Sequence, residues 1–373
     1  MADRIIFANT LRGFAAIFVL ISHFVGIFFV MNPAICDLLG VPKLESLPPL
    51  PKIFSFIADN CIIFGQFGVG IFFIVSGLVV PFSLKSSTRR EFIFRRALRI
   101  YPVYIVGFSF AMFVLYLLAL HKNIDYHFSL FDISSHFGII TREPLGVARI
   151  DGISWTLEIE IYFYLILCLL SPFALNFDFQ KYLIALLVVA VLAVIAFKYK
   201  NYLIGVQVAS GLMLLLGMGY YSLINKKITM TQLWVVQAVV LVLIPILWLG
   251  VAQRAEYTYL WMSGYLLAIA VFYVCFLWRK KFTENKFFEH FADISYPLYV
   301  VHALFGYAVM YFVVEIGYGS IAAIVVASLA SYAAAVAIHL MIEKPFLRWS
   351  KSRRPAIVVT NLVEIGADRR ILK

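Results

Sequence analysis

The chain reads LRGFAAIFVLISHFVGIFFVM at residues 11–31. This stretch is predominantly apolar, and its two ionisable side chains are Arg12 and His23. A helix needs about 20 apolar residues to cross about 30 Å of hydrocarbon, so the stretch predicts a membrane-spanning helix. No small-residue cleavage site follows it, which indicates a retained span rather than a removed signal peptide.

The composition extends this interpretation to the whole chain. Of 373 residues, 63% are hydrophobic and 14% are charged, and the mean hydropathy is +0.93. Soluble domains carry about one-quarter charged residues, so a soluble protein with a single core is excluded. No linker or low-complexity segment divides the apolar stretches. We therefore expect one membrane domain at 1–345 and a basic cytoplasmic tail at 346–373.

Further apolar stretches follow the first one. Those long enough to cross a membrane lie at 61–82, 101–120, 155–175, 182–198, 202–224, 232–250, 257–278, 294–314 and 318–342. Most of the 31 Lys and Arg residues then fall on the side of the N-terminus, and positively charged loops stay in the cytoplasm. The sequence therefore predicts an all-α polytopic membrane protein with about ten transmembrane helices and both termini cytoplasmic. The net charge of +11 reflects this topology and does not indicate nucleic-acid binding.

His23 is an ionisable residue placed near the middle of the first span. It lies 12 residues beyond Leu11, about 18 Å along a helix. Eleven residues, about three turns, separate it from Arg12, so both side chains project from one face. Two interpretations stay open, namely a functional residue and a core histidine that is hydrogen-bonded to a neighbouring helix.

Two carboxylates open the fourth predicted span, which reads WTLEIEIYFY at residues 155–164. A carboxylate in hydrocarbon is costly without a partner, so each one needs a role. Being two residues apart on a helix, they point to different faces. We interpret Glu158 as an interfacial carboxylate in contact with external water. Glu160 lies deeper, shares a face with Tyr164, and is expected to meet His23.

The densest basic cluster reads RREFIFRRALRIYP at residues 89–102. On a helix Arg95, Arg96 and Arg99 are neighbours at spacings of three and four residues. Guanidinium groups bind phosphates through paired hydrogen bonds, so the cluster suits a phosphate-bearing substrate. The alternative is a topology signal that touches lipid phosphates.

Small residues indicate close helix packing in two segments. Glycines recur through GQFGVGIFFIVSG at residues 65–77, and no strand precedes them, so a dinucleotide site is rejected. In the last span small residues recur every four positions and end in a histidine, at Ala323, Ala327, Ser331, Ala335 and His339.

The remaining polar candidates are few. His302 in the ninth span is either a second site histidine or a hydrogen-bonded core residue. The four cysteines are too scattered for a zinc site or a disulfide framework, and no metal site is expected. Cys36 and Cys61 could share the external compartment, where a disulfide between them is an open alternative.

Taken together, these segments resemble the acyltransferase 3 family of multi-pass membrane carbohydrate O-acyltransferases, from residue 9 to about 345. Five motifs in order carry the resemblance. They are Leu11-Arg12-Gly13 with His23, Gly68-Val69-Gly70-Ile71-Phe72-Phe73 with Ser76-Gly77, Arg95-Arg96-Ala97-Leu98-Arg99-Ile100-Tyr101-Pro102, Trp155-Thr156-Leu157 with Glu160 and Phe163-Tyr164, and Ile294-Ser295-Tyr296-Pro297-Leu298-Tyr299 with His302 and Glu343-Lys344-Pro345.

The resemblance implies ten membrane helices, an acyl-CoA co-substrate without a permanently bound cofactor, and the hydroxyl of a surface-polysaccharide or lipid-linked sugar as acceptor. Acetyl is the expected acyl group, and succinyl stays open. The resemblance also implies essential roles for the positions matched by His23 and the arginine cluster. It further implies that the protein lies in a bacterial plasma membrane. Asn9 stands where the family often has Asp.

In the mechanism that we expect, Arg12, Arg95, Arg96 and Arg99 bind the CoA phosphates. His23 then acts as general base on the acceptor hydroxyl, or carries the acyl group itself, while Glu160 orients its ring. Secondary site candidates are Asn9, Tyr164, Ser295, Tyr299 and His302.

Two other classes of function compete with this one. A proton-coupled transporter or lipid-linked sugar flippase would use His23 and Glu160 as a proton relay. The sequence lacks the paired Gly/Pro-broken helices that inverted-repeat carriers tend to show. A non-catalytic membrane sensor would not require the arginine cluster.

Overall fold

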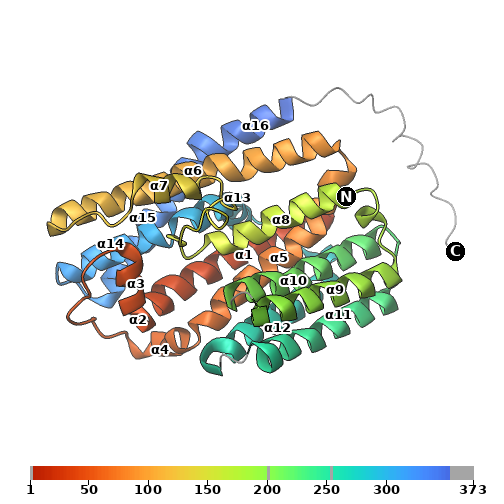
Figure 1. The fold of residues 1–373 in the computed structure, drawn as a ribbon, viewed down its shortest axis with the longest axis horizontal. Coiled ribbons are helices and arrows are strands. Elements are labelled where there is room, and N and C mark those ends of the chain that lie inside the picture. The colour runs from red at the N-terminus through yellow and green to blue at the C-terminus, as the bar shows by residue number, and fades with distance from the viewer. Residues whose placement is uncertain (1–2, 200–201, 253–254, 353–373) are drawn as a thin grey trace.

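The computed structural model describes residues 3–199, 202–252 and 255–352. Within these ranges the regular secondary structure is entirely helical. Figure 1 shows long helices that run together in one bundle. The predicted all-α fold is therefore confirmed, while the part of the predicted tail from residue 353 onward lies outside the described ranges.

Within the described residues, eight helical segments are long and apolar enough to cross a membrane. They are Ile6–Val30, α5 (Cys61–Lys85), α6 (Arg89–Lys122), α9 (Phe179–Tyr199), α10 (Tyr202–Ile224), Met230–Val251, Thr258–Leu277 and Ser320–Ser350. Three of these combine several elements. Ile6–Val30 contains parts of α1 (Asp3–Ile21), η1 (Ser22–Ile27) and α2 (Phe28–Val30), and Met230–Val251 is α11 (Met230–Pro245) with η3 (Ile246–Val251). Ser320–Ser350 contains α15 (Ser320–Ile338), η5 (His339–Glu343) and most of α16 (Lys344–Ser352), whereas Thr258–Leu277 lies within the single helix α12 (Ala255–Leu277).

The two remaining predicted spans also coincide with helices. α13 (Lys286–Val301) and α14 (Leu304–Glu315) are together apolar enough to form one span, although it is bent by 68°. The span predicted at 155–175 corresponds to α8 (Ser154–Leu170), a helix of 17 residues. The chain is thus an all-α polytopic membrane protein, and the cytoplasmic placement of its termini stays a prediction.

Short elements connect the spans. They are α3 (Asn32–Leu39), α4 (Lys52–Asp59), α7 (Leu130–His136), η2 (Ala174–Asn176) and η4 (Arg279–Lys281). In Figure 1, α3, α4 and α7 lie toward one end of the bundle, away from the N-terminus and the start of α6. The segment between the first and second predicted spans and the segment between the third and fourth therefore fold, in part, as short helices at this end.

Glycines bring two pairs of helices, α5 with α10 and α1 with α13, into close backbone contact. A Cβ at Gly77 of α5 would lie 2.1 Å from the carbonyl oxygen of Leu214, and one at Gly217 of α10 would lie 2.2 Å from that of Ile74. A Cβ at Gly13 would lie 2.6 Å from the carbonyl oxygen of Phe288, which fixes α1 close to α13. Close approach through small residues is the packing that the sequence predicted.

The small-residue seam of the last span also packs as predicted. Its members in α15, namely Ala323, Ala327, Ser331 and Ala335, are all fully buried. His339, which ends the seam, pairs with Glu343 of the same helix through Nδ1 and Oε2 at 2.7 Å.

Two of the irregular segments lie in the spans that carry His23 and His302. The first helix widens to a π-helix at Ser22–Ile27, the segment that holds His23. The α13–α14 span breaks at His302 and Ala303. Departures from regular helix often mark functional sites, and here both contain ionisable side chains.

The possible disulfide is not formed. Cys36 and Cys61 are both buried and both free. Each thiol is enclosed by its own neighbours: Cys36 donates to Asn32 Oδ1 at 3.5 Å, and Cys61 packs against Ile62 and Leu260.

Candidate active site

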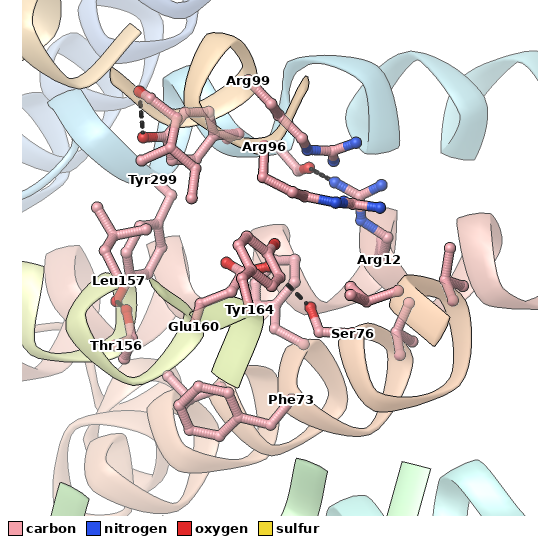
Figure 2. A pocket seen from close by; sticks show the side chains of 18 of the residues that line it. Arg12, Phe73, Ser76, Arg96, Arg99, Thr156, Leu157, Glu160, Tyr164 and Tyr299 are labelled. Atoms are coloured by element: carbon pink, nitrogen blue, oxygen red, sulfur yellow. Dashed lines mark hydrogen bonds between the residues drawn. The ribbon is translucent and has the colours of Figure 1, made fainter. Parts of the chain in front are cut away.

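A cavity of about 120 Å³ lies among five helices, α1, α5, α6, α8 and α13. Figure 2 shows its polar side chains. The guanidinium groups of Arg12, Arg96 and Arg99 gather toward one end, and Tyr299 and Thr156 lie at the other. Residues from all the motifs singled out in the sequence therefore line one space.

The basic end is built by α1 and α6. Arg12 Nη2 donates a hydrogen bond to Ser295 Oγ at 3.2 Å. Arg96 lies over the ring of Tyr164, with its guanidinium carbon 5.1 Å from the ring centre. Such a cation–π contact holds a charged group against an aromatic face. Arg95 does not line the cavity, and its charge acts instead on Glu91 at the start of α6.

Glu160 lies between the two ends. Its Oε1 accepts hydrogen bonds from Ser76 Oγ of α5, at 3.0 Å, and from the Tyr164 hydroxyl one turn further along α8. Its charge also acts on Arg12 across the cavity. Among the described residues Glu160 has no hydrogen bond to His23, so the predicted contact between them is wrong.

The far end of the cavity is closed by Tyr299. Its hydroxyl is 2.7 Å from Thr156 Oγ1 and donates to the carbonyl oxygen of Ile153 at 3.2 Å, which ties α13 to the start of α8. The Tyr299 ring is also in contact with the His302 ring, at 5.5 Å between centroids. This tyrosine therefore stands between the cavity and the histidines.

His23 has partners from the broken α13–α14 span. Its Nδ1 is 2.5 Å from the Tyr307 hydroxyl, and its ring meets the His302 ring edge to face at 4.5 Å between centroids. Arg12 contacts the same span through Ser295. Arg12 and His23 therefore both contact the α13–α14 span, and the position that we assigned to Glu160 is taken by Tyr307.

His302 is held in one tautomer. Its Nδ1 lies 2.8 Å from the carbonyl oxygen of Tyr299 and 3.2 Å from that of Leu298. A carbonyl oxygen can only accept, so Nδ1 carries the proton and neutral His302 has its lone pair at Nε2. This Nε2 is buried and has no hydrogen-bond partner within the described ranges. His302 thus keeps a proton acceptor available beside His23.

Glu158 does not face external water, contrary to the interpretation from the sequence. It is 2% exposed and forms ion pairs with Arg142 and Arg149, each at 2.8 Å. Gln207 Nε2 of α10 donates to it as well, at 2.5 Å. Both arginines come from the loop between α6 and α8, which folds back over the start of α8. A carboxylate with three such partners is a structural anchor.

Sequence reasoning missed Tyr307 as a site residue. It lies one turn of helix beyond the His302 break, where nothing in its spacing connects it to the first span. Ser76 and Thr156 belong to motifs of the resemblance, but the sequence assigned neither of them a function. Their roles depend on contacts between helices that are far apart in the sequence.

The fold and the cavity define a multi-pass membrane protein with an arginine-lined site between its helices. Comparison with protein families then identifies its class, because a family model described as an acyltransferase domain matches residues 5–340. The match covers nearly the whole chain, so the protein belongs to this acyltransferase family and is an integral membrane acyltransferase. Neither the curated proteins nor the solved structures contain a match.

Proposed function

We propose that this protein transfers a short acyl group from acyl-CoA to a hydroxyl of a surface-polysaccharide or lipid-linked sugar. The carrying observation is the convergence of the Arg12, Arg96 and Arg99 guanidinium groups at one end of the cavity between the helices. Acetyl is the acyl group that we propose first, with succinyl as the alternative, and a bacterial plasma membrane is the proposed location.

The cavity has a basic end that suits the phosphates of acyl-CoA and an apolar wall that suits its uncharged pantetheine arm. Guanidinium groups bind phosphate through charge-assisted, paired hydrogen bonds, so the basic end receives the phosphates. The wall of the cavity is mainly apolar beyond the arginines, where Val69, Phe72 and Val79 of α5 line it. An uncharged pantetheine arm can lie along such a wall, which brings the thioester toward Tyr299.

The chemical step would take place at His23, on the other side of Tyr299, so in our proposal the Tyr299 side chain moves aside to let the thioester reach it. In our proposal the Tyr307 oxygen accepts the Nδ1–H hydrogen bond, so His23 Nε2 carries the lone pair. Nε2 removes the proton of the sugar hydroxyl while the hydroxyl oxygen attacks the thioester carbon. The carbon–sulfur bond breaks, and the CoA thiolate takes the proton back from the imidazolium. General-base assistance of this kind contributes about 10²–10⁴ in rate.

Glu160 receives a different role from the one first expected. Its hydrogen bonds to Ser76 and Tyr164 place its carboxylate inside the arginine cavity, where its charge acts on Arg12. We propose that it balances the arginines until the CoA phosphates enter.

The transporter or flippase alternative relied on a proton relay from His23 to Glu160. These side chains have separate hydrogen-bond partners, Tyr307 for the first and Ser76 with Tyr164 for the second. The geometry therefore favours group transfer over a relay between these two residues.

The direct test is acyl transfer by the purified protein in proteoliposomes. Radiolabelled acetyl-CoA and succinyl-CoA are supplied with a polysaccharide acceptor, and label in the glycan is measured. We expect transfer by the wild type and by His290→Ala, an exposed histidine of α13, and its loss in His23→Ala. Full transfer by His23→Ala would remove the histidine from the reaction, and no transfer by the wild type would overturn the proposed function.

A further inference from the structure

A second cavity, of about 250 Å³, lies between α3 and the loops on either side of α7. Its polar wall is formed by Asp37, His127, Asp132 and Arg149, and Phe128 supplies an aromatic face. The loop with His127 and Phe128 follows the last residue of α6, whereas the arginine cluster belongs to its first turns. The two cavities are therefore associated with opposite ends of α6, which is 34 residues long.

The aromatic wall of this cavity is fixed in place. The Tyr126 hydroxyl donates to the Met112 carbonyl oxygen at 3.1 Å, and its ring contacts the Phe128 ring at 5.6 Å between centroids. Gly40, which ends α3, has a φ of +69°, and a Cβ there would lie 3.1 Å from His127 Cβ. Only a glycine lets the end of α3 and this loop approach so closely at that backbone angle.

The polar groups are held as well. Asp132 Oδ2 accepts hydrogen bonds from the Ser129 hydroxyl at 2.6 Å and from its backbone N–H at 3.2 Å. Arg149 is held by its ion pair with Glu158. Asp37 is exposed and has no ion pair within the described ranges. A cavity with oriented acceptors costs little further ordering when a ligand binds.

The chemistry of the wall selects the ligand. Asp37 and Asp132 offer carboxylate oxygens that accept hydrogen bonds from hydroxyls. The charge of Arg149 is paired with Glu158 through Nη2, while its buried Nε has no hydrogen-bond partner within the described ranges. The described residues contain no group of three side chains that could hold a metal ion, so the two carboxylates are not part of a cation site. The unbalanced negative charge disfavours anions. A neutral molecule rich in hydroxyls, with an apolar face to lie on Phe128, meets these conditions.

We propose that this cavity, the outer subsite, binds neutral sugar units of the polymeric acceptor. The inference rests on the proposed function, because it assigns a place to the acceptor of that reaction. Asp37 follows His23 by 14 residues, at most about 21 Å along a helix, so a chain of several sugars reaches from one to the other. Through Arg149 and Glu158 the subsite is also linked to α8, which carries Glu160 into the arginine cavity.

The test is glycan binding to the full-length protein in nanodiscs. The probes are the neutral and the acidic oligosaccharide fractions released from the surface polysaccharide of the source cells, each fluorescently labelled. Asp37→Ala removes a charged acceptor, and Phe128→Leu removes the flat face but keeps apolar bulk. Asp125→Ala is the matched control, because Asp125 is an exposed aspartate of the same loop that does not line the cavity.

We expect Asp37→Ala and Phe128→Leu each to weaken binding of the neutral fraction about tenfold, as loss of one charged hydrogen bond or one stacked face does. Asp125→Ala should bind like the wild type, and acetyl-CoA affinity should be unchanged in all three. Binding of the neutral fraction by Asp37→Ala and Phe128→Leu as tight as by the wild type, or stronger binding of the acidic fraction than of the neutral one by the wild type, would overturn the proposal.

The two hypotheses fail in different ways. Glycan that binds at this cavity without any acyl transfer by the wild type contradicts the proposed function and leaves the outer subsite standing. Acyl transfer whose KM for the glycan is the same in Asp37→Ala and Phe128→Leu as in the wild type contradicts the outer subsite alone.

Discussion

The Nδ1 atom of His23 lies 2.5 Å from the hydroxyl oxygen of Tyr307, across 284 positions of sequence. The contact joins the π-helical segment of the first span to the second half of the broken span. Because one ring nitrogen of His23 is engaged in this way, the other is the nitrogen that can exchange a proton with a substrate.

Removal of the Tyr307 hydroxyl should lower the rate of transfer without weakening substrate binding. In Tyr307→Phe the His23 ring loses its orienting partner, and we expect kcat to fall about tenfold with the KM for acetyl-CoA unchanged. Tyr311→Phe is the matched control, since that hydroxyl lies one turn further along α14 and bonds to the carbonyl of Pro42. A similar fall in both variants would point to a general disturbance of α14.

The arginines of α6 should differ in how much they contribute to the binding of acetyl-CoA. Arg96 lines the cavity and Arg95 does not. We expect Arg96→Ala to weaken acetyl-CoA binding about tenfold to a hundredfold, as loss of a charge-assisted phosphate contact does, and Arg95→Ala to have a much smaller effect. Binding of acetyl-CoA and of its dephosphorylated analogue by each variant measures this. If both variants bind both ligands as tightly as the wild type does, the arginine cluster serves only as a topology signal.

Neutralising Glu160 should strengthen the binding of acetyl-CoA. Its carboxylate lies among the cavity residues and acts on Arg12, so Glu160→Gln removes a charge that repels phosphate. We expect the KM for acetyl-CoA to fall about threefold, which corresponds to less than 1 kcal/mol of Coulomb energy. Steady-state kinetics at varied acetyl-CoA provide the measurement. A fall in kcat of a hundredfold or more would instead restore a direct role beside His23.

Glu158 should matter for stability more than for catalysis. Its removal in Glu158→Ala leaves the buried Arg142 and the half-buried Arg149 without their counter-charge, a change that costs about 3–5 kcal/mol. The midpoint of thermal unfolding in detergent should fall clearly. Lys181→Ala, which breaks the exposed pair with Asp178 but keeps Asp178 at the start of α9, should change it little, because exposed pairs contribute about 0–1 kcal/mol. Equal midpoints for the two variants would contradict the anchoring role.

The cysteines should behave as free thiols. Burial raises the pKa of the Cys36 thiol, which keeps it protonated and slow to react in the folded protein. A maleimide reagent should therefore label Cys36 and Cys61 slowly in the native state and fully after denaturation, with no reductant added. Mass spectrometry counts the labels. Label that appears on these two residues only after reduction would establish the disulfide.

Much of the architecture could be predicted from local sequence. Hydrophobic stretches of about 20 residues specify spans regardless of their neighbours, because the bilayer requires every backbone group to be bonded within its own helix. The expectation that Arg12 and His23 share one face followed from helical periodicity alone. The role of small residues at Gly77 and in the α15 seam followed from the space that close helices require.

The partners of the polar residues could not be predicted in this way. Glu160 was expected at His23 because both lie at similar depth, yet depth does not fix the rotation of α8, which turns Glu160 toward Ser76. Glu158 was expected in water because it begins a span, yet the preceding loop covers it with Arg142.

The sequence by itself determined that this protein is a helical membrane protein with a histidine in its first span and an arginine cluster at the start of α6. Both are properties of short segments, set by hydropathy and helical spacing. Only the tertiary structure decided that Tyr307 and His302 are the neighbours of His23, because contacts between helices depend on their mutual rotation and on the break in the α13–α14 span. Hydropathy carries no information about either.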